Sequence, residues 1–480
     1  MAGIGFELKK LFQKNGIFAL LRAYGYAGAV CAGPMLLGIA LLLGVHYISE
    51  TAGLDRMGQN MLTCMITYSL LSSMIITNSF GMITTRYTAD CLYEGKPHMV
   101  MPSFYGSISL MMTVGGLLYG LFLFMTDIPV VYGLLNYILF EELIIVWTEM
   151  NYLTAIKDYK GILLAFLVSL VMGLAAGYIL TCVFHFEVKL TLLSCVCATY
   201  EVMAIWYYVL LLGYFPAGEG SRFKFLKWLW KYPSLFFCGL FVSIGMFAHI
   251  LLMWGSDIGV RIHGLYYMAP QYDVPALAAF LSTLITTINF VTSVEVNFYP
   301  KYRTYYSLFN DEGVLADILQ AEKEMRITLQ DELSYTATKQ VFVTIIFIVL
   351  GTIVLPLLPL GFNEEMLGIF RVLCLGYAFY AIGNSIMLMS LYFADNKGAC
   401  FSAMVFALGS VAATLFIMRL PVRYYGFGFV AGAALFTLTA ALRLWYYQRR
   451  IRFYVLCSQP LVEKKRRWRP DRIANHCMNR

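Results

Sequence analysis

The sequence has 480 residues, of which 60% are hydrophobic and only 13% are charged, and its mean hydropathy is +0.70. About a quarter of the residues of a typical soluble domain are charged, because a folded soluble protein must present a polar surface to water. The composition therefore excludes a soluble enzyme, a disordered chain and a secreted disulfide scaffold, and the long apolar runs exclude a β-barrel. The formal net charge of +7 favours basic loops beside anionic lipid over a nucleic-acid partner.

Long apolar runs recur along the whole chain. A helix needs about 20 mostly apolar residues to cross a bilayer. The predicted spans, in chain order, are 17–46, 60–86, 103–126, 129–154, 161–184, 190–214, 234–255, 274–299, 338–360, 366–394, 398–418 and 424–447. The fold class predicted is an all-α membrane protein with about twelve transmembrane helices.

The positions of Lys and Arg predict the orientation of these spans. If the N-terminus is cytoplasmic, most of the basic residues outside the spans fall on the cytoplasmic side. The outside loops then contain only Arg56, Lys189, Arg261, Arg419 and Arg423. Basic residues are enriched in cytoplasmic loops, so we expect a multi-pass protein of the bacterial cytoplasmic membrane with both termini in the cytoplasm.

The chain divides into two halves with six predicted spans each. Two six-helix bundles around a central lumen are typical of transporters. Lys224, Lys227 and Lys231 share one face of the connecting segment, which predicts an amphipathic linker in the membrane interface. The predicted organisation is an N-terminal bundle (1–216), this linker (217–233), a C-terminal bundle (234–448) and a basic cytoplasmic tail (449–480).

The longest inside connection predicts a cytoplasmic helix over 311–333. Its apolar stripe contains Val314, Ile318, Met325 and Leu329, spaced as on one face of a helix. This helix is a candidate for docking a cytoplasmic partner. The alternative is a helix that packs on the inner rim of the protein itself.

Ionisable residues inside the predicted spans are the candidate transport residues. Each costs about 2.5–3.5 kcal/mol at the bilayer centre, so we expect each to face protein or water. Glu142 and Glu149 are two helical turns apart and share a face of the fourth span. The full candidate set is Glu141, Glu142, Glu149, Glu201, Glu295 and Arg371. These residues are expected to line a polar, acidic cavity between the bundles. Such a cavity could bind a sugar through hydrogen bonds or carry a coupling proton or cation; alternatively, some of these residues could form structural pairs.

The first predicted span contains a run of small residues that ends in Gly33 and Pro34. A proline inside a helix kinks it, so these two residues are the candidate hinge, with tight static packing as the alternative. The sequence has no nucleotide-binding Gly-x4-Gly-Lys-Ser/Thr loop, no His-Glu-x-x-His motif and no Gly-x-Ser-x-Gly motif. We therefore expect neither an enzyme nor a cofactor or metal site.

Several local motifs resemble one known family. They are Met1-Ala-Gly-Ile-Gly-Phe-Glu-Leu-Lys-Lys10, Ala23-Tyr-Gly-Tyr-Ala-Gly28 with Gly33-Pro34, Arg86-Tyr87-Thr-Ala-Asp90-Cys-Leu-Tyr93, Lys157-Asp158-Tyr159, Tyr272-Asp273-Val-Pro275 and Glu295-Val-Asn-Phe-Tyr-Pro-Lys301-Tyr-Arg303. Together they resemble the Pel exopolysaccharide exporter family, the G subunit of that system, which is similar to the polysaccharide flippases of the multidrug/oligosaccharidyl-lipid/polysaccharide superfamily. The resemblance extends over essentially the whole chain.

The resemblance implies two six-helix bundles around a lumen and export of a hexosamine-rich exopolysaccharide for the biofilm matrix. It also implies partners, namely other Pel membrane subunits and a cytoplasmic glycosyltransferase, in addition to membrane lipid. Two alternatives remain open. One is an ion-coupled antiporter or flippase for drugs or lipid-linked oligosaccharides, with which the acidic residues in the spans are compatible. The other is a membrane glycosyltransferase or acyltransferase, against which the missing motifs count.

Overall fold

The computed structural model describes residues 36–156, 159–215, 218, 220–310, 313–358 and 361–456. A helix covers Leu36–Thr51. The remaining helices and strands are α3 (Arg56–Tyr93), α4 (Val100–Thr126), α5 (Val130–Ile156), α6 (Tyr159–Tyr178), α7 (Val188–Tyr214), α8 (Leu226–Lys231), α9 (Pro233–Trp254), β1 (Val260–His263), β2 (Tyr266–Met268), α10 (Pro270–Phe280), α11 (Thr283–Ser293), α12 (Tyr299–Asn310), α13 (Leu315–Val354), α14 (Glu364–Tyr392), α15 (Asn396–Ile417), α16 (Phe427–Arg449) and α17 (Ile451–Leu456).

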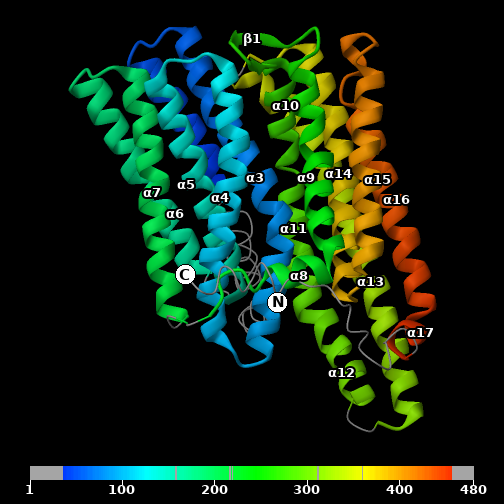
Figure 1. Ribbon diagram of the computed structural model, residues 1–480. Coiled ribbons are helices and arrows are strands. Elements are labelled where there is room, and N and C mark those ends of the chain that lie inside the picture. Colours follow the sequence, from blue (N-terminus) through cyan, green and yellow to red (C-terminus); the bar gives the residue numbers. More distant parts are fainter. Residues whose placement is uncertain are drawn as a thin grey trace, which may run out of the picture.

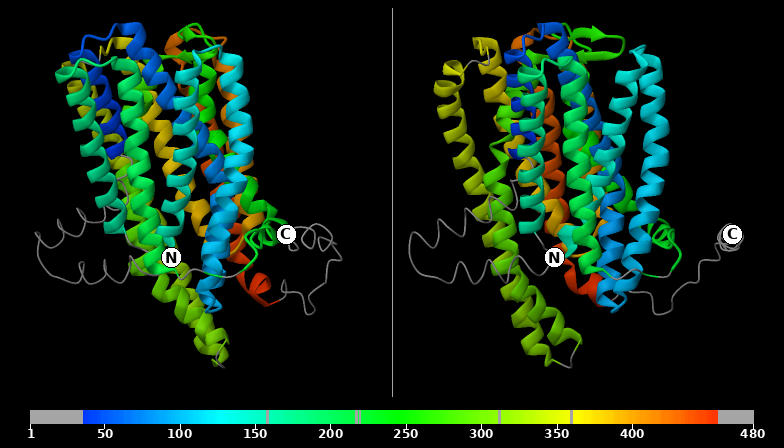
Figure 2. Two further views of the ribbon diagram at one scale, coloured as in Figure 1. Left: turned by 60° about the vertical axis from the view of Figure 1, so that its left-hand side comes forward. Right: turned by 90° about the vertical axis from the view of Figure 1, so that its left-hand side faces the viewer.

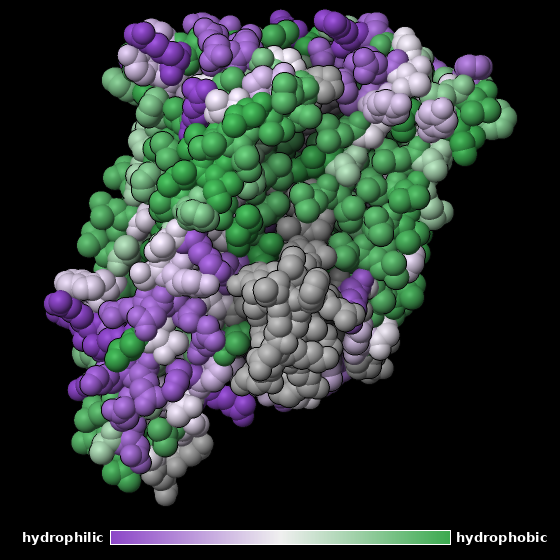
Figure 3. Space-filling view, turned by 180° about the vertical axis from the view of Figure 1, so that it is seen from behind, coloured by the Kyte–Doolittle hydropathy of each residue, from purple (hydrophilic) through white to green (hydrophobic). Residues whose placement is uncertain are grey.

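The protein is an all-α membrane protein. Among the described residues, 11 helices are long and apolar enough to cross a bilayer. On the face seen in Figure 3, a hydrophobic band crosses the molecule, with hydrophilic residues above it and below it. The exposed apolar side chains of α13, such as Val341, Ile345 and Val349, are placed as expected for a helix surface in contact with lipid. Of the first predicted span, only the part from Leu36 onward is described, and Gly33 and Pro34 lie outside the described residues.

The helices form two groups that lie beside each other (Figure 1). The first group contains α3 to α7, with α5 packed against α3, α4 and α7. The second group contains α9 to α16, with α15 packed against α9 and α16 and with α14 packed against α10, α13 and α16. Helix α3 packs along α9 and so joins the groups. We refer to this α3–α9 contact as the seam.

Helix α13 joins two predicted elements into one. The sequence predicts a cytoplasmic helix over 311–333 and a separate span over 338–360, but α13 runs continuously from Leu315 to Val354. The cause is local, because no glycine or proline occurs between Val314 and Ile348, and nothing therefore ends the helix. Together with α12, the first part of α13 projects from the helix groups (Figure 2).

The predicted span 274–299 is interrupted. Helix α10 ends at Phe280, α11 begins at Thr283, and a π-helical turn covers Val294–Phe298 before α12. Ser282 Oγ donates to Ala279 O at 2.7 Å and Thr283 Oγ1 donates to Phe280 O at 2.8 Å. Side-chain hydroxyl groups thus satisfy carbonyl groups at the break, which is the condition for irregular backbone inside a membrane protein.

The base of the α12–α13 projection is fixed by ion pairs and aromatic rings. Glu322 on α13 is buried, and its carboxylate accepts hydrogen bonds from Arg326 at 2.7 Å and from Arg452 on α17 at 2.6 Å. Phe298 and Tyr302 pack beside Phe393, and Tyr447 stacks on Tyr454 at 4.4 Å. These contacts hold the projection to the second helix group.

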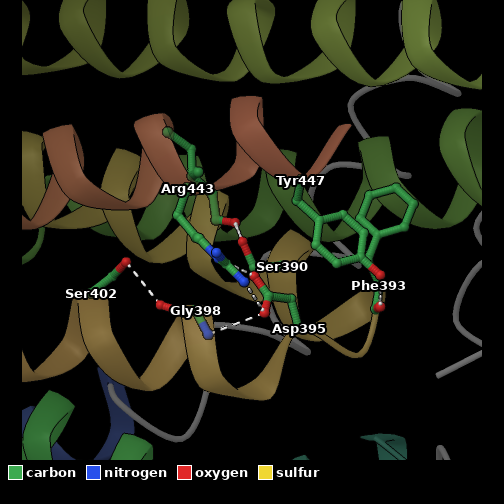
Figure 4. Close-up of polar contacts among 8 residues, drawn as sticks. Ser390, Phe393, Asp395, Gly398, Ser402, Arg443 and Tyr447 are labelled. Carbon is green, nitrogen blue, oxygen red and sulfur yellow. Dashed lines mark hydrogen bonds and ion pairs between the residues drawn. The ribbon is translucent and has the colours of Figure 1, made fainter. Parts of the chain in front are cut away.

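A bidentate ion pair closes the turn between α14 and α15. Arg443 Nε lies 2.6 Å from Asp395 Oδ2, and Arg443 Nη2 lies 2.9 Å from Asp395 Oδ1 (Figure 4). Asp395 also caps α15 by accepting from Gly398 N at 3.2 Å, and its side chain is only 7% exposed. Mutation of a buried, paired acid that also caps a helix therefore reduces stability more than mutation of a surface ion pair.

We predict that Asp395→Ala lowers the free energy of unfolding by about 2–4 kcal/mol, because it leaves a partly buried guanidinium unpaired and removes a helix cap. Thermal unfolding of the purified protein in detergent measures this effect. The matched control is Glu94→Ala, which removes the exposed Lys96–Glu94 pair and should cost less than about 1 kcal/mol. Equal losses in the two variants would contradict the prediction.

Candidate functional site: the acidic residues of α5 and the seam

Glu141 lies between α5 and α4. A Cβ atom at Gly116 of α4 would collide with Glu141 Oε1 and with the hydroxyl of Tyr137, so the absence of a side chain at Gly116 makes room for this carboxyl group. Glu141 is 9% exposed. Its Oε2 atom is buried and has no hydrogen-bond partner among the described residues.

Glu142 lies within electrostatic range of Glu201 on the neighbouring helix α7. The two carboxylates are close enough to interact electrostatically, and both also act on Cys197 of α7. Cys197 Sγ in turn donates to Leu135 O of α5 at 3.5 Å. Glu142 Oε2 is buried without a hydrogen-bond partner within the described part of the chain, whereas Glu201 is exposed. The structure therefore brings these two predicted residues together.

Glu149 is the most buried of the predicted acids. It is 1% exposed, its Oε2 atom also lacks a hydrogen-bond partner in the described ranges, and it lies near Tyr207 of α7. An unpaired carboxylate at such a position is costly unless it binds a proton or a cation. The described residues contain no group of three or more His, Cys, Asp or Glu side chains arranged to hold a metal ion. Each of the three α5 acids thus has a buried carboxylate oxygen without a hydrogen-bond partner in the described part of the chain.

The remaining predicted residues are placed differently. Arg371 belongs to the second helix group, where its Nε atom donates to Thr352 Oγ1 of α13 at 3.1 Å. Glu295 lies in the π-helical turn Val294–Phe298, and its side chain is outside the described part. The structure therefore places Glu142 near Glu201, Glu141 against α4 and Arg371 at a separate helix contact.

The seam contains uncharged polar residues, which a search of the spans for charged residues does not find. Asn78 Nδ2 of α3 donates to Ser243 Oγ of α9 at 3.3 Å. A Cβ atom at Gly239 would collide with the carbonyl oxygen of Asn78, so α3 and α9 approach each other closely here. Small residues permit such approach between membrane helices. The sequence signal that could have indicated this contact is the spacing of four residues between Gly239 and Ser243.

At one end of the seam, α8 is fixed to α3 by the motif that starts at Arg86. Trp228 Nε1 donates to Asp90 Oδ2 at 2.7 Å, and Asp90 pairs with Arg86 at 3.1 Å. The buried ring of Tyr87 meets Trp228 edge to face at 4.8 Å. The Arg86-Tyr87-Thr-Ala-Asp90 motif therefore attaches α8, which lies in the connection between the two halves, to α3.

At the other end of the seam, the motif Tyr272-Asp273-Val-Pro275 fixes the start of α10. Trp254 Nε1 donates to both carboxylate oxygens of Asp273 at 3.0 Å, and Ala269 N donates to Asp273 Oδ2 at 3.0 Å. The buried His249 Nδ1 lies 2.8 Å from the hydroxyl oxygen of Tyr272. Trp254 stacks on Tyr68 of α3 at 4.5 Å, so this motif also supports a contact between the groups.

The model of one protein family matches residues 1–456. The chain belongs to the PelG family of putative exopolysaccharide exporters (EPS-E). It is therefore a multi-pass membrane transporter of an exporter family and not an enzyme. No curated protein sequence matches it significantly.

Solved structures with a similar fold include MATE transporters and a further MOP superfamily transporter. An inward-facing multidrug resistance MATE family transporter of the MOP superfamily has a TM-score of 0.57 at 12% identity, covering 90% of this chain and 100% of that chain. A crystal structure of a MATE point mutant has a TM-score of 0.61 at 12% identity, with 89% and 96% covered. A MOP superfamily transporter from Pyrococcus furiosus has a TM-score of 0.53 at 12% identity, with 89% and 96% covered. These likenesses identify the fold of this PelG family member.

We predict that Gly239→Ala destabilises the protein by about 1–3 kcal/mol, because the added methyl group meets the backbone of α3 and forces the seam apart. The apparent melting temperature in detergent measures the change. Gly213→Ala is the control, since a Cβ atom there has no neighbour within 4 Å. Unchanged stability of the Gly239 variant would contradict the close approach at the seam.

Proposed function

We propose that this protein exports a hexosamine-rich, Pel-type exopolysaccharide across the bacterial cytoplasmic membrane by movement of the two helix groups about the seam. The observation that carries the proposal is the match to the exporter family over residues 1–456. It is supported by helix groups that meet along a defined contact, α3 against α9, as expected of a transporter that alternates between closed and open forms.

The orientation proposed places the β1–β2 end outside and the α12–α13 projection in the cytoplasm. Lys and Arg residues are concentrated near α8 and α12, whereas Arg261 is the basic residue of the hairpin. The projection then provides a surface beyond the bilayer for the cytoplasmic glycosyltransferase and other Pel subunits. Its ion pair to α17 would couple binding of such a partner to the second helix group.

The acids of α5 are proposed to serve transport through protonation. Glu142 and Glu149 have no Lys or Arg ion pair within the described residues, and each has a buried oxygen without a partner there. A second candidate function rests on this observation. An ion-coupled antiporter or flippase for drugs or lipid-linked oligosaccharides would use the same acids to exchange protons for substrate.

We predict that deletion of the gene abolishes surface polymer while cytoplasmic sugar-nucleotide pools stay intact, because synthesis of precursors does not depend on export. Lectin staining of intact cells and extraction of nucleotide sugars measure the two quantities. Surface polymer that persists in the deletion strain would contradict the proposed function. Loss of drug resistance in place of polymer would favour the antiporter.

We predict that the double variant Glu142→Gln, Glu149→Gln exports severalfold less polymer while its amount in the membrane is unchanged, because glutamine keeps the size of the side chain but cannot exchange a proton. Surface polymer and immunoblots of membranes provide the readout. The control variant Glu50→Gln changes an exposed acid near the end of the helix Leu36–Thr51. Normal export by the double variant would contradict a role of these two α5 acids in transport.

A further inference from the structure

The β1–β2 hairpin belongs to the second half of the chain but packs on the first helix group. Its buried residues Ile262 and Tyr266 lie in the same hydrophobic core as α3, α4 and α5. Gly264 forms the turn with φ of +53°, and a Cβ atom there would collide with Thr126 O at the end of α4. His263 Nε2 lies 3.0 Å from Asp127 O. The hairpin is therefore seated on the first group across the end of the seam.

Tyr266 is the residue by which the hairpin enters the first group, and it is 0% exposed. Its hydroxyl group donates to Asn136 Oδ1 of α5 at 3.0 Å. Its ring meets Tyr68 at 5.0 Å and Phe122 at 5.6 Å, in both cases edge to face. We define the side chains around Tyr266 as the socket, made of Tyr68, Ser69, Tyr119, Phe122 and Asn136.

The polar groups of the socket are held in place before any ligand arrives. Asn136 Nδ2 donates to Met65 O at 2.9 Å, which fixes the amide and leaves its oxygen facing Tyr266. Tyr119 donates to the same oxygen at 2.6 Å, and Ser69 Oγ lies 3.0 Å from the Tyr119 hydroxyl. Preorganised acceptors and donors of this kind give a polar ligand orientation at low entropic cost.

The socket has the chemistry of a site for an uncharged sugar. All five of its side chains are uncharged, and they combine three aromatic rings with an amide and hydroxyl groups. The C–H faces of a pyranose ring pack on aromatic rings, and its hydroxyl or acetamido groups pair with amide and hydroxyl partners. A tyrosine ring with its hydroxyl group is a flat apolar body with one polar end, and it resembles one sugar ring in size and in this polarity.

Space for more than one ring adjoins the socket. A pocket of about 250 Å³ lies under β1, between the starts of α3, α5 and α7. Met65 lines this pocket and also accepts the hydrogen bond from Asn136, while Ile262 of the hairpin forms its cover. Tyr132 adds an aromatic ring, and Asp55 and Lys189, of opposite charge, also line the pocket. Lifting the hairpin would join the pocket to the socket.

We propose that the socket is a glycan-binding site, which Tyr266 occupies in this conformation and a pyranose unit of the exported chain occupies when the hairpin lifts. The proposal rests on the proposed function and names its ligand class, an uncharged sugar chain. Tyr266 and glycan compete for the same groups. The hairpin therefore closes the end of the seam when no chain is present, and the passing chain itself keeps it open.

Binding of short glycans to the purified protein in lipid nanodiscs tests the competition. The probe is chitopentaose, a neutral N-acetylated pentasaccharide, and its fully deacetylated cationic counterpart tests the charge requirement. Tyr266→Ala should bind chitopentaose about tenfold or more tightly than the wild type, because removal of an internal competitor raises the binding-competent fraction. Leu265→Ala, an exposed neighbour on the hairpin, should bind like the wild type, and adding Asn136→Ala to Tyr266→Ala should abolish the gain.

Three results would overturn the proposal. They are equal affinity of the Tyr266 and Leu265 variants, a gain that survives the loss of Asn136, and preference for the cationic glycan. If Tyr266→Ala does not fold, hydrogen exchange of the wild-type protein tests whether the glycan displaces the hairpin. Saturating chitopentaose should then accelerate exchange of the amides of β1 and β2, and unchanged or slower exchange would refute displacement of the hairpin.

Failure of this inference is distinguishable from failure of the proposed function. If deletion of the gene removes surface polymer but chitopentaose neither binds the socket nor displaces the hairpin, the exporter stands and the glycan site is refuted. If surface polymer survives deletion of the gene, the exporter proposal fails whatever the binding result is.

Discussion

Polar groups inside a bilayer have no water to satisfy them, so the contacts that join the two helix groups must satisfy one another. The groups meet through Asn78 and Ser243 within the seam, and through Tyr68 at the hairpin end. The Tyr68 hydroxyl donates to Tyr267 O and accepts from Tyr267 N, both at 3.0 Å. If the groups separate, each of these partners must find a replacement. In the proposed function, a polar substrate provides one, so that opening of the seam is linked to the presence of cargo.

The same constraint explains why the family motifs lie where they do. Asp90 accepts a hydrogen bond from the Trp228 indole at one end of the seam, and Asp273 accepts one from the Trp254 indole at the other. In both cases a carboxylate fixes an indole that packs on a tyrosine of α3, namely Tyr87 or Tyr68. The seam is thus framed by two similar contacts on one 38-residue helix. This arrangement allows α3 to act as the common element about which either end can open.

Much of the fold follows from the sequence, because a run of about 20 apolar residues has few alternatives to a spanning helix. Periodicity also indicated that Glu142 and Glu149 share a face of α5. The sequence pattern does not predict the break after Phe280, because Ser282 and Thr283 are not helix breakers. They act here by hydrogen bonding to the backbone. The β1–β2 hairpin has only 4 and 3 residues per strand, too few for a clear alternation. The Tyr266 socket depends on tertiary contacts between residues 130 positions apart, which no local pattern reveals.

The central claim is that the hairpin end of the seam opens and closes. Spin labels on Leu265 in the hairpin and on Val131 at the start of α5, both exposed, report the separation of these elements by pulsed electron paramagnetic resonance in nanodiscs. The account predicts a short and a long distance population, with chitopentaose shifting weight to the long one. A single short distance that does not respond to glycan would contradict it.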